Sequence, residues 1–152
     1  MPQLKLIALD QEDLQIISAH LQDAIVRVDE IAYLPNESRF AAIVRRFDWT
    51  GGDGDNGVYE RRQSALRFEK INNAQYKDIP LGGGGDTALE LLAINYEPTD
   101  EVGGTITLVF AGGSAIRLAA DTIEAELRDL GPVWKTQVKP EHPEDKPVER
   151  TG

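Results

Sequence analysis

The sequence predicts a mainly β, α+β domain: an antiparallel barrel or split sheet of about seven strands with an N-terminal helix and a C-terminal capping helix. Short runs rich in β-branched and aromatic residues recur between residues 24 and 118, separated by turn-forming residues. Apolar residues recur at helical spacing before and after these runs. A chain of 152 residues can bury one hydrophobic core, and we expect residues 1–138 to form a single globular domain.

The N-terminal segment predicts a helix over residues 11–22. Asp10 is suited to cap its N-terminus, acidic residues occupy the first turn, and leucine and isoleucine recur at helical spacing. The preceding residues 4–9 are apolar on both sides, so they fit either a short strand or a packed entry segment.

The middle of the chain predicts several strands. Three short antiparallel strands are expected in AIVRV, IAYL and RFAAIVRRF, because β-branched and aromatic residues dominate them. Apolar and charged residues alternate in RRQSALRFEKI, which predicts a strand with one solvated face. A central strand is expected in ALELLAINYE, which is apolar on nearly both faces.

The C-terminal third predicts a hairpin followed by a helix. Alternating strands are expected in TITLVF and SAIRLA, and Gly112 and Gly113 lie between them, where a tight turn requires positive φ. The segment DTIEAELRDLG predicts a helix, with Asp121 as N-cap and Glu124 as its capping-box partner. Residues 139–152 are rich in proline and charge and poor in apolar side chains, which predicts a disordered tail.

This order of elements resembles a pleckstrin-homology-like barrel, and the alternative is a two-layer α/β sandwich with both helices on one face. The chain also resembles a family of short bacterial proteins that carries a domain-of-unknown-function label. The resemblance covers residues 4–134, in the segments LKLIALDQEDLQIISAHLQDA, YLPNESRFAAIVRRFDW, ALRFEKI, LLAINYEP and FAGGSAIRLAADTIEAELRDLGPVW. It implies a bacterial origin and supplies no catalytic motif.

Charge and composition restrict the classes of function. The 26 acidic and 16 basic residues give a net charge of −10, which disfavours duplex nucleic acid and anionic membranes as partners. No apolar stretch reaches the length of a membrane span and the N-terminus lacks the pattern of a secretory signal, so we expect a cytoplasmic location. With no cysteine, two histidines and no cofactor motif, we expect neither a metal nor a cofactor.

Four arginines form the candidate site. Arg45, Arg46, Arg61 and Arg62 flank the glycine-rich loop at residues 48–60. If the flanking strands pair, the four guanidinium groups meet near the mouth of the loop, an arrangement suited to binding phosphate or carboxylate. The alternative is that acidic residues of the same loop neutralise them.

No combination of nucleophile, base and orienting group stands out, so we expect a binding module and not an enzyme. The leading hypothesis is recognition of a protein partner through an exposed sheet face or an open strand edge. The alternative is a small-molecule or anion-binding domain that uses the arginine cluster, and an enzyme is the third possibility.

Overall fold

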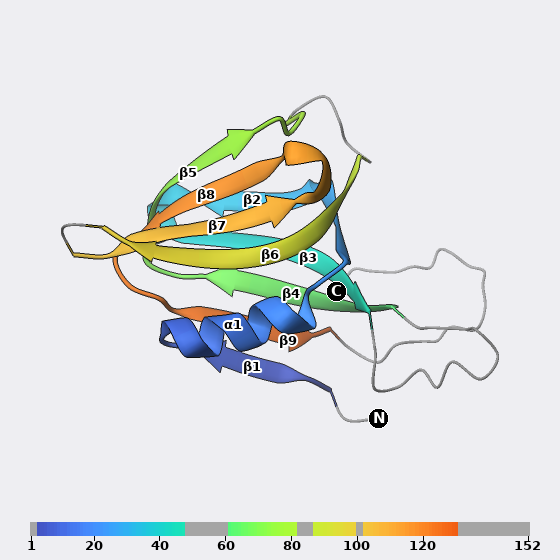
Figure 1. Cartoon of the computed structure of the whole chain (residues 1–152), viewed down its shortest axis with the longest axis horizontal. Coiled ribbons are helices and arrows are strands. Elements are labelled where there is room, and N and C mark those ends of the chain that lie inside the picture. Colours follow the sequence, from blue (N-terminus) through green and yellow to red (C-terminus); the bar gives the residue numbers. More distant parts are fainter. Residues whose placement is uncertain (1–2, 48–60, 82–86, 100–101, 131–152) are drawn as a thin grey trace.

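The computed structural model describes residues 3–47, 61–81, 87–99 and 102–130, which form one antiparallel sheet with one α-helix (Figure 1). The mainly β class is therefore confirmed. The helix is α1 (Gln11–His20), and 3-10 turns lie at Pro35–Glu37 and Ala111–Gly113. The strands are β1 (Lys5–Ala8), β2 (Ala24–Leu34), β3 (Arg39–Phe47), β4 (Arg61–Phe68), β5 (Ile71–Lys77), β6 (Ala88–Pro98), β7 (Gly104–Phe110), β8 (Ala115–Ala120) and β9 (Ala125–Asp129).

The nine strands lie in the order β1-β9-β4-β3-β2-β6-β7-β8-β5. The sheet curls so that β8, β7 and β6 lie in front of β2 and β3 (Figure 1). It is not closed, because β1 and β5 are its two outer strands and do not pair with each other. An open sheet with a single α-helix in the described part of the chain supports neither a pleckstrin-homology-like barrel nor a sandwich with two helices on one face.

Strand alternation builds the core between the two layers. Phe40 and Phe68 are fully buried partners on β3 and β4, with ring centroids 6.3 Å apart. Leu66 on β4, with Ile106 and Leu108 on β7, shows the same alternation of buried with more exposed positions. Burial of each such side chain contributes about 1.5–3 kcal/mol, so the inward-facing positions hold the curled sheet together.

Helix α1 confirms the helix expected near the N-terminus, although it ends at His20 and not at residue 22. Asp10 Oδ1 accepts a hydrogen bond from Asp13 N at 2.8 Å, which is the expected N-cap. The helix packs between β6 and β1 (Figure 1). On the β6 side, Ser18 Oγ accepts from Ile94 N and Gln15 Nε2 donates to Ile94 O, so helical side chains satisfy strand backbone groups.

The helix predicted over residues 121–131 is wrong, because Ala125–Asp129 forms strand β9 between β1 and β4. Ile123 and Leu127 fit a helical repeat, but they also belong to a buried alternation that runs through Ala125 to Asp129. Pairing with two strands gives β9 backbone hydrogen bonds on both sides. These hydrogen bonds to two neighbouring strands outweigh a local preference for helix capping of about 1 kcal/mol.

The hairpin prediction is confirmed, but two of the predicted strand boundaries differ in the structure. The β7–β8 hairpin is confirmed, with φ of 85° at Gly112 and 95° at Gly113. The two strands expected in AIVRV and IAYL are one strand, β2, whereas RRQSALRFEKI is divided between β4 and β5. Residues 48–60 and the expected tail at 139–152 lie outside the described residues.

In the part of the chain that is described, no helix is long and apolar enough to cross a lipid bilayer.

Two glycines with positive φ provide a test of the fold. A Cβ at Gly103 would overlap the backbone oxygen of Ala120, whereas a Cβ at Gly112 would have no atom within 4 Å. We expect Gly112→Ala to cost about 1 kcal/mol of backbone strain and Gly103→Ala considerably more, because backbone atoms must move. Thermal unfolding measures both, at roughly 2–4 °C per kcal/mol for a domain of this size. Equal shifts would contradict the placement of β8 against Gly103.

Candidate functional site

The β3–β4 hairpin brings the four predicted arginines together in pairs. Arg46 lies opposite Arg62, and both are buried at 7% exposure on the inner face of the sheet. Arg45 and Arg61 point to the outer face. The strands pair as the sequence suggested, but alternation divides the cluster between the two faces.

Arg46 forms a buried ion pair with Asp129 on β9. Arg46 Nε lies 3.0 Å from Asp129 Oδ1, and Arg46 Nη2 lies 2.9 Å from Oδ2. The carboxylate also accepts from Ser64 Oγ at 2.7 Å and from Leu4 N at 2.9 Å. The hydrogen-bond potential of a buried carboxylate is thus well satisfied, which a buried charge requires.

The pKa of Asp129 reflects two opposing influences. Burial alone would raise the pKa of the carboxyl group, but hydrogen bonds from Arg46, Leu4 and Ser64, together with the charge of Arg46, hold it below its usual value of 3.8. Asp129 is therefore ionised at neutral pH, and its buried charge is paired with that of Arg46.

The two outer arginines also have partners within the protein. Arg45 Nη1 lies 2.7 Å from Glu30 Oε1 on β2. Arg61 Nη1 donates to the carbonyl oxygens of Asp23 and Arg45, and its guanidinium carbon lies 4.3 Å from the centre of the Phe47 ring. An external anion would compete with these contacts, and anion binding at the hairpin remains a prediction.

A second feature is an incomplete junction between β2 and β5, which we call the β2–β5 seam. β2 pairs with β6 only through Ala24–Arg27, and β5 pairs only with β8. Next to this junction, Ile71 N at the start of β5 donates to the carbonyl oxygen of Ser38, which follows β2 and the 3-10 turn, at 2.9 Å. Beyond that point, neither β5 nor residues 29–34 of β2 have a strand partner on this side within the described chain.

Half-buried side chains face the interior along the β2–β5 seam. They pack against the core, and they are Ile31, Tyr33, Ala74, Tyr76 and Ile79. Burial, followed by the charge of Tyr33, raises the pKa of the Tyr76 hydroxyl.

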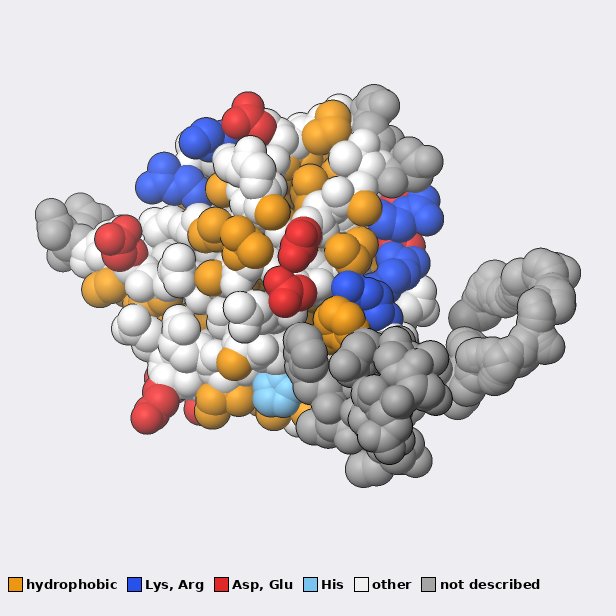
Figure 2. Space-filling view, turned by 45° about the vertical axis from the view of Figure 1, so that its right-hand side comes forward, with side chains coloured by type: hydrophobic (Ala, Val, Ile, Leu, Met, Phe, Trp, Pro, Cys, Tyr) orange, Lys and Arg blue, Asp and Glu red, His pale blue; other side chains and the backbone are white. Residues whose placement is uncertain are grey.

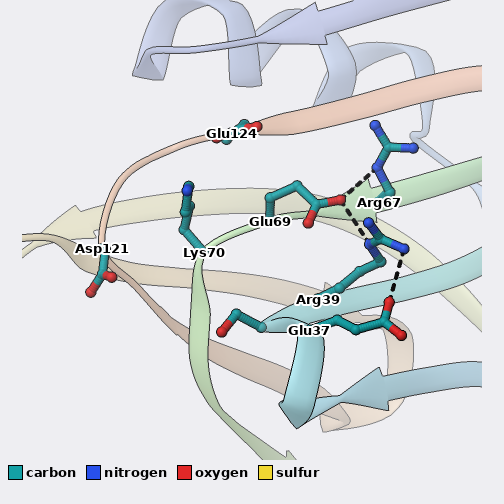
Figure 3. A pocket seen from close by; sticks show the side chains of 8 residues that line it. Glu37, Arg39, Arg67, Glu69, Lys70, Asp121 and Glu124 are labelled. Atoms are coloured by element: carbon teal, nitrogen blue, oxygen red, sulfur yellow. Dashed lines mark hydrogen bonds and ion pairs between the residues drawn. The ribbon is translucent and has the colours of Figure 1, made fainter.

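A third feature is a charged pocket of about 520 Å³ at the corner where β4 leads into β5, which we call the corner pocket (Figure 3). Glu69 Oε2 lies 2.9 Å from Arg39 Nε and 2.7 Å from Arg67 Nε, so one carboxylate oxygen contacts two guanidinium groups. Eight residues line the pocket: Glu37, Ser38, Arg39, Arg67, Glu69, Lys70, Asp121 and Glu124.

Sequence reasoning missed the residues of the corner pocket. Arg67 and Glu69 share a face of one predicted strand, but nothing local indicates that Arg39 and Glu124 lie beside them. It also missed Asp129, although an acid that continues the alternation Ile123, Ala125, Leu127 would have indicated a buried ion pair if the segment had been recognised as a strand.

The described residues thus form a mainly β fold, with an open sheet, helix α1 and a polar corner. Among the described residues, no three histidine or acidic side chains gather as metal ligands. The family described as "Protein of unknown function (DUF2948)" matches residues 4–142, and the chain belongs to this family. The family resemblance seen in the sequence is thereby confirmed. No curated protein and no solved structure matched the chain.

The two arginines at adjacent positions of β3 should differ greatly in their effect on stability. Arg46→Gln leaves the buried Asp129 carboxylate without its ion-pair partner, so we expect the free energy of unfolding to fall by about 3–5 kcal/mol. Arg45→Gln breaks a pair whose side chains are each 27% exposed, and we expect a loss of about 1 kcal/mol or less. Urea unfolding at neutral pH measures both, and similar losses would contradict the assigned roles.

The lowered pKa of Asp129 predicts how stability depends on pH. A carboxyl group whose pKa is depressed by folding stabilises the native state above its unfolded pKa, and this contribution is lost as the pH falls through the folded pKa. The difference in unfolding free energy between wild type and Asp129→Asn should therefore shrink as the pH falls from about 5 to about 2.5. Other carboxyl groups titrate in both proteins and cancel. A difference that is independent of pH would show that Asp129 does not titrate with folding.

Proposed function

We propose that this domain is a protein-binding module that takes up an extended segment of its partner as an added strand at the β2–β5 seam. The observation that carries this proposal is that, among the described residues, β5 and residues 29–34 of β2 each have one edge without a strand partner. An extended peptide gains affinity from main-chain hydrogen bonds to such an edge.

The backbone at the β2–β5 seam has hydrogen-bonding groups to offer. In an antiparallel strand, the N–H and C=O groups of alternate residues point away from the paired neighbour. On β5 the groups pointing away from β8 meet a protein partner at Ile71, through Ser38, where the junction is closed. Further along β5 and along residues 29–34 of β2, an added strand would supply the missing partners.

Side chains at the β2–β5 seam would supply specificity. Alternate residues of an added strand point toward the protein interior, where they would contact Ile31, Tyr33, Ala74 and Tyr76. A segment that alternates apolar with polar residues fits this surface, because its apolar side would lie on the half-buried tyrosines while their hydroxyl groups accept or donate hydrogen bonds.

The other outer strand is less suited to strand addition. β1 has four residues, and α1 packs beside it. Exposed apolar residues do occur there, with Ile7 at 56% and Leu9 at 63% exposure. Figure 2 shows hydrophobic side chains distributed over the visible face with acidic side chains among them, so exposed apolar groups alone do not single out one site.

The test begins with peptides selected by display against the wild-type protein. We expect their binding to slow amide hydrogen exchange in residues 29–34 or 72–77, because an added strand protects the edge with which it pairs. Tyr76→Ala should weaken binding at least tenfold. Tyr96→Ala is the matched control, since Tyr96 is another half-buried tyrosine, on β6, and it lies outside the seam.

Protection of a different surface, or an equal loss of affinity in both tyrosine variants, would contradict strand addition at the β2–β5 seam. Thermal unfolding of the two variants shows whether each remains folded under the conditions of the binding measurement.

A further inference from the structure

Helix α1 takes the place of a neighbouring strand along the second half of β6. In the described chain, β2 pairs with β6 only through Ala88–Leu91, and beyond these residues α1 packs beside β6 (Figure 1). There the helix satisfies the backbone of Ile94, because Ser18 Oγ accepts a hydrogen bond from its N–H and Gln15 Nε2 donates to its carbonyl oxygen at 3.2 Å. The backbone groups of Ile94 therefore point away from β7 and toward α1.

The same edge of β6 continues at Tyr96, two residues after Ile94. β6 and β7 pair without a register shift from Ala93 to Pro98, so Ile94 and Tyr96 direct their backbone groups to the same side. The Tyr96 side chain faces the core and lies over Gly104, where a Cβ would come within 2.6 Å of its ring. No strand of the described chain pairs with β6 at this edge of Tyr96, so one main-chain N–H and one C=O are available to another molecule.

A pocket of about 430 Å³ lies next to this edge, and we call it the β6 pocket. On its strand side, an asparagine and a glutamate of β6 each lie opposite a threonine of β7 on the outer face of the sheet. On its helix side, two glutamines lie one turn apart on α1. The volume falls within the range of natural small-molecule sites, roughly 300–1,000 Å³. Seven residues line the β6 pocket: Gln11, Gln15, Asn95, Tyr96, Glu97, Thr105 and Thr107.

The lining of the β6 pocket is polar, and Glu97 alone among its described residues carries a charge. Three of the others end in amide groups and two in aliphatic hydroxyl groups. Arg117 lies opposite Thr107 on β8, but it does not line the pocket. An anionic ligand would be repelled by Glu97 without an ion pair from the lining to offset that repulsion, which favours a ligand without negative charge.

The hydrogen-bonding capacity of the lining narrows the ligand further. The Glu97 carboxylate and the Tyr96 carbonyl only accept, the Tyr96 N–H only donates, and the amide and hydroxyl side chains do both. An ammonium ligand has no acceptor to offer the Tyr96 N–H or the amide N–H groups. A hydroxyl group both donates and accepts, so a neutral molecule with several hydroxyl groups can pair with every member of this set.

We propose that the β6 pocket binds a neutral saccharide. Its hydroxyl groups donate to the Glu97 carboxylate and the Tyr96 carbonyl, and one of them accepts from the Tyr96 N–H. Asn95 and the opposing Thr107 bind a further hydroxyl group. The β6 pocket shares no residue with the β2–β5 seam, so this proposal and the proposed peptide site are tested independently.

The test uses the full chain, isotope-labelled for amide NMR, and titrates it with glucose, galactose and mannose at constant ionic strength and neutral pH. We expect at least one hexose to give saturable shifts at the amides of Gln15, Tyr96 and Glu97 at up to about 50 mM, well above a dissociation constant of about 1 mM. The corresponding uronate, which carries a carboxylate in place of the terminal hydroxymethyl group, should bind at least tenfold more weakly because Glu97 repels it. If no hexose gives saturable shifts, or if the uronate binds as well as its parent, the proposal is wrong.

Two variants then test the lining of the β6 pocket. Glu97→Ala removes the carboxylate and Asn95→Ala removes an amide, and both side chains are exposed, so neither change removes core packing. We expect Glu97→Ala to raise the dissociation constant at least tenfold and Asn95→Ala at least threefold, because hydrogen bonds to a charged group are the stronger ones. Glu90→Ala is the matched control, since Glu90 is another exposed glutamate of β6 and lies outside the pocket. Unchanged affinity in either pocket variant, or an equal loss in the control, would overturn the assignment.

Discussion

The buried carboxylate of Asp129 joins three strands that are distant in the sequence. It accepts hydrogen bonds from Leu4 beside β1, from Ser64 on β4 and from Arg46 on β3. These contacts fix β9 in place between β1 and β4. The position of β1 in turn sets the position of α1, which packs between β1 and β6. One almost fully buried charged group therefore connects the strands on this side of the sheet.

Incomplete strand pairing is the physical origin of the β2–β5 seam. The register of β2 against β3 shifts between Val26 and Ile31, and β2 has left β6 by Val28. Among the described residues, the second half of β2 therefore has no paired strand on this side. The corner pocket arises nearby, because the chain turns at Lys70 between β4 and β5 and brings Arg67, Glu69 and Lys70 beside the β8–β9 connection.

The candidate sites show where sequence reasoning about function reaches its limit. The positions of the four hairpin arginines on paired strands could be predicted, because two alternating segments separated by a glycine-rich loop indicate a hairpin. Their partners could not, since Asp129 lies on a strand far along the chain and Glu30 lies in the irregular part of β2. The corner pocket could not be predicted from the sequence either, because its lining residues come from segments that only the curl of the sheet brings together.

The sequence by itself determined the elements whose signals are local. Asp10 caps α1 through a neighbour three residues away, and the paired glycines at 112 and 113 permit a turn that few other residues tolerate. The tertiary structure decided the conformation of residues 121–129, in which Ile123 and Leu127 satisfy both a helical and a strand repeat. Local capping favoured a helix, but β1 and β4 each offered an edge to pair with and Arg46 offered a partner for Asp129. Such long-range contacts outweigh a local preference because they satisfy both backbone edges and a buried charge at once.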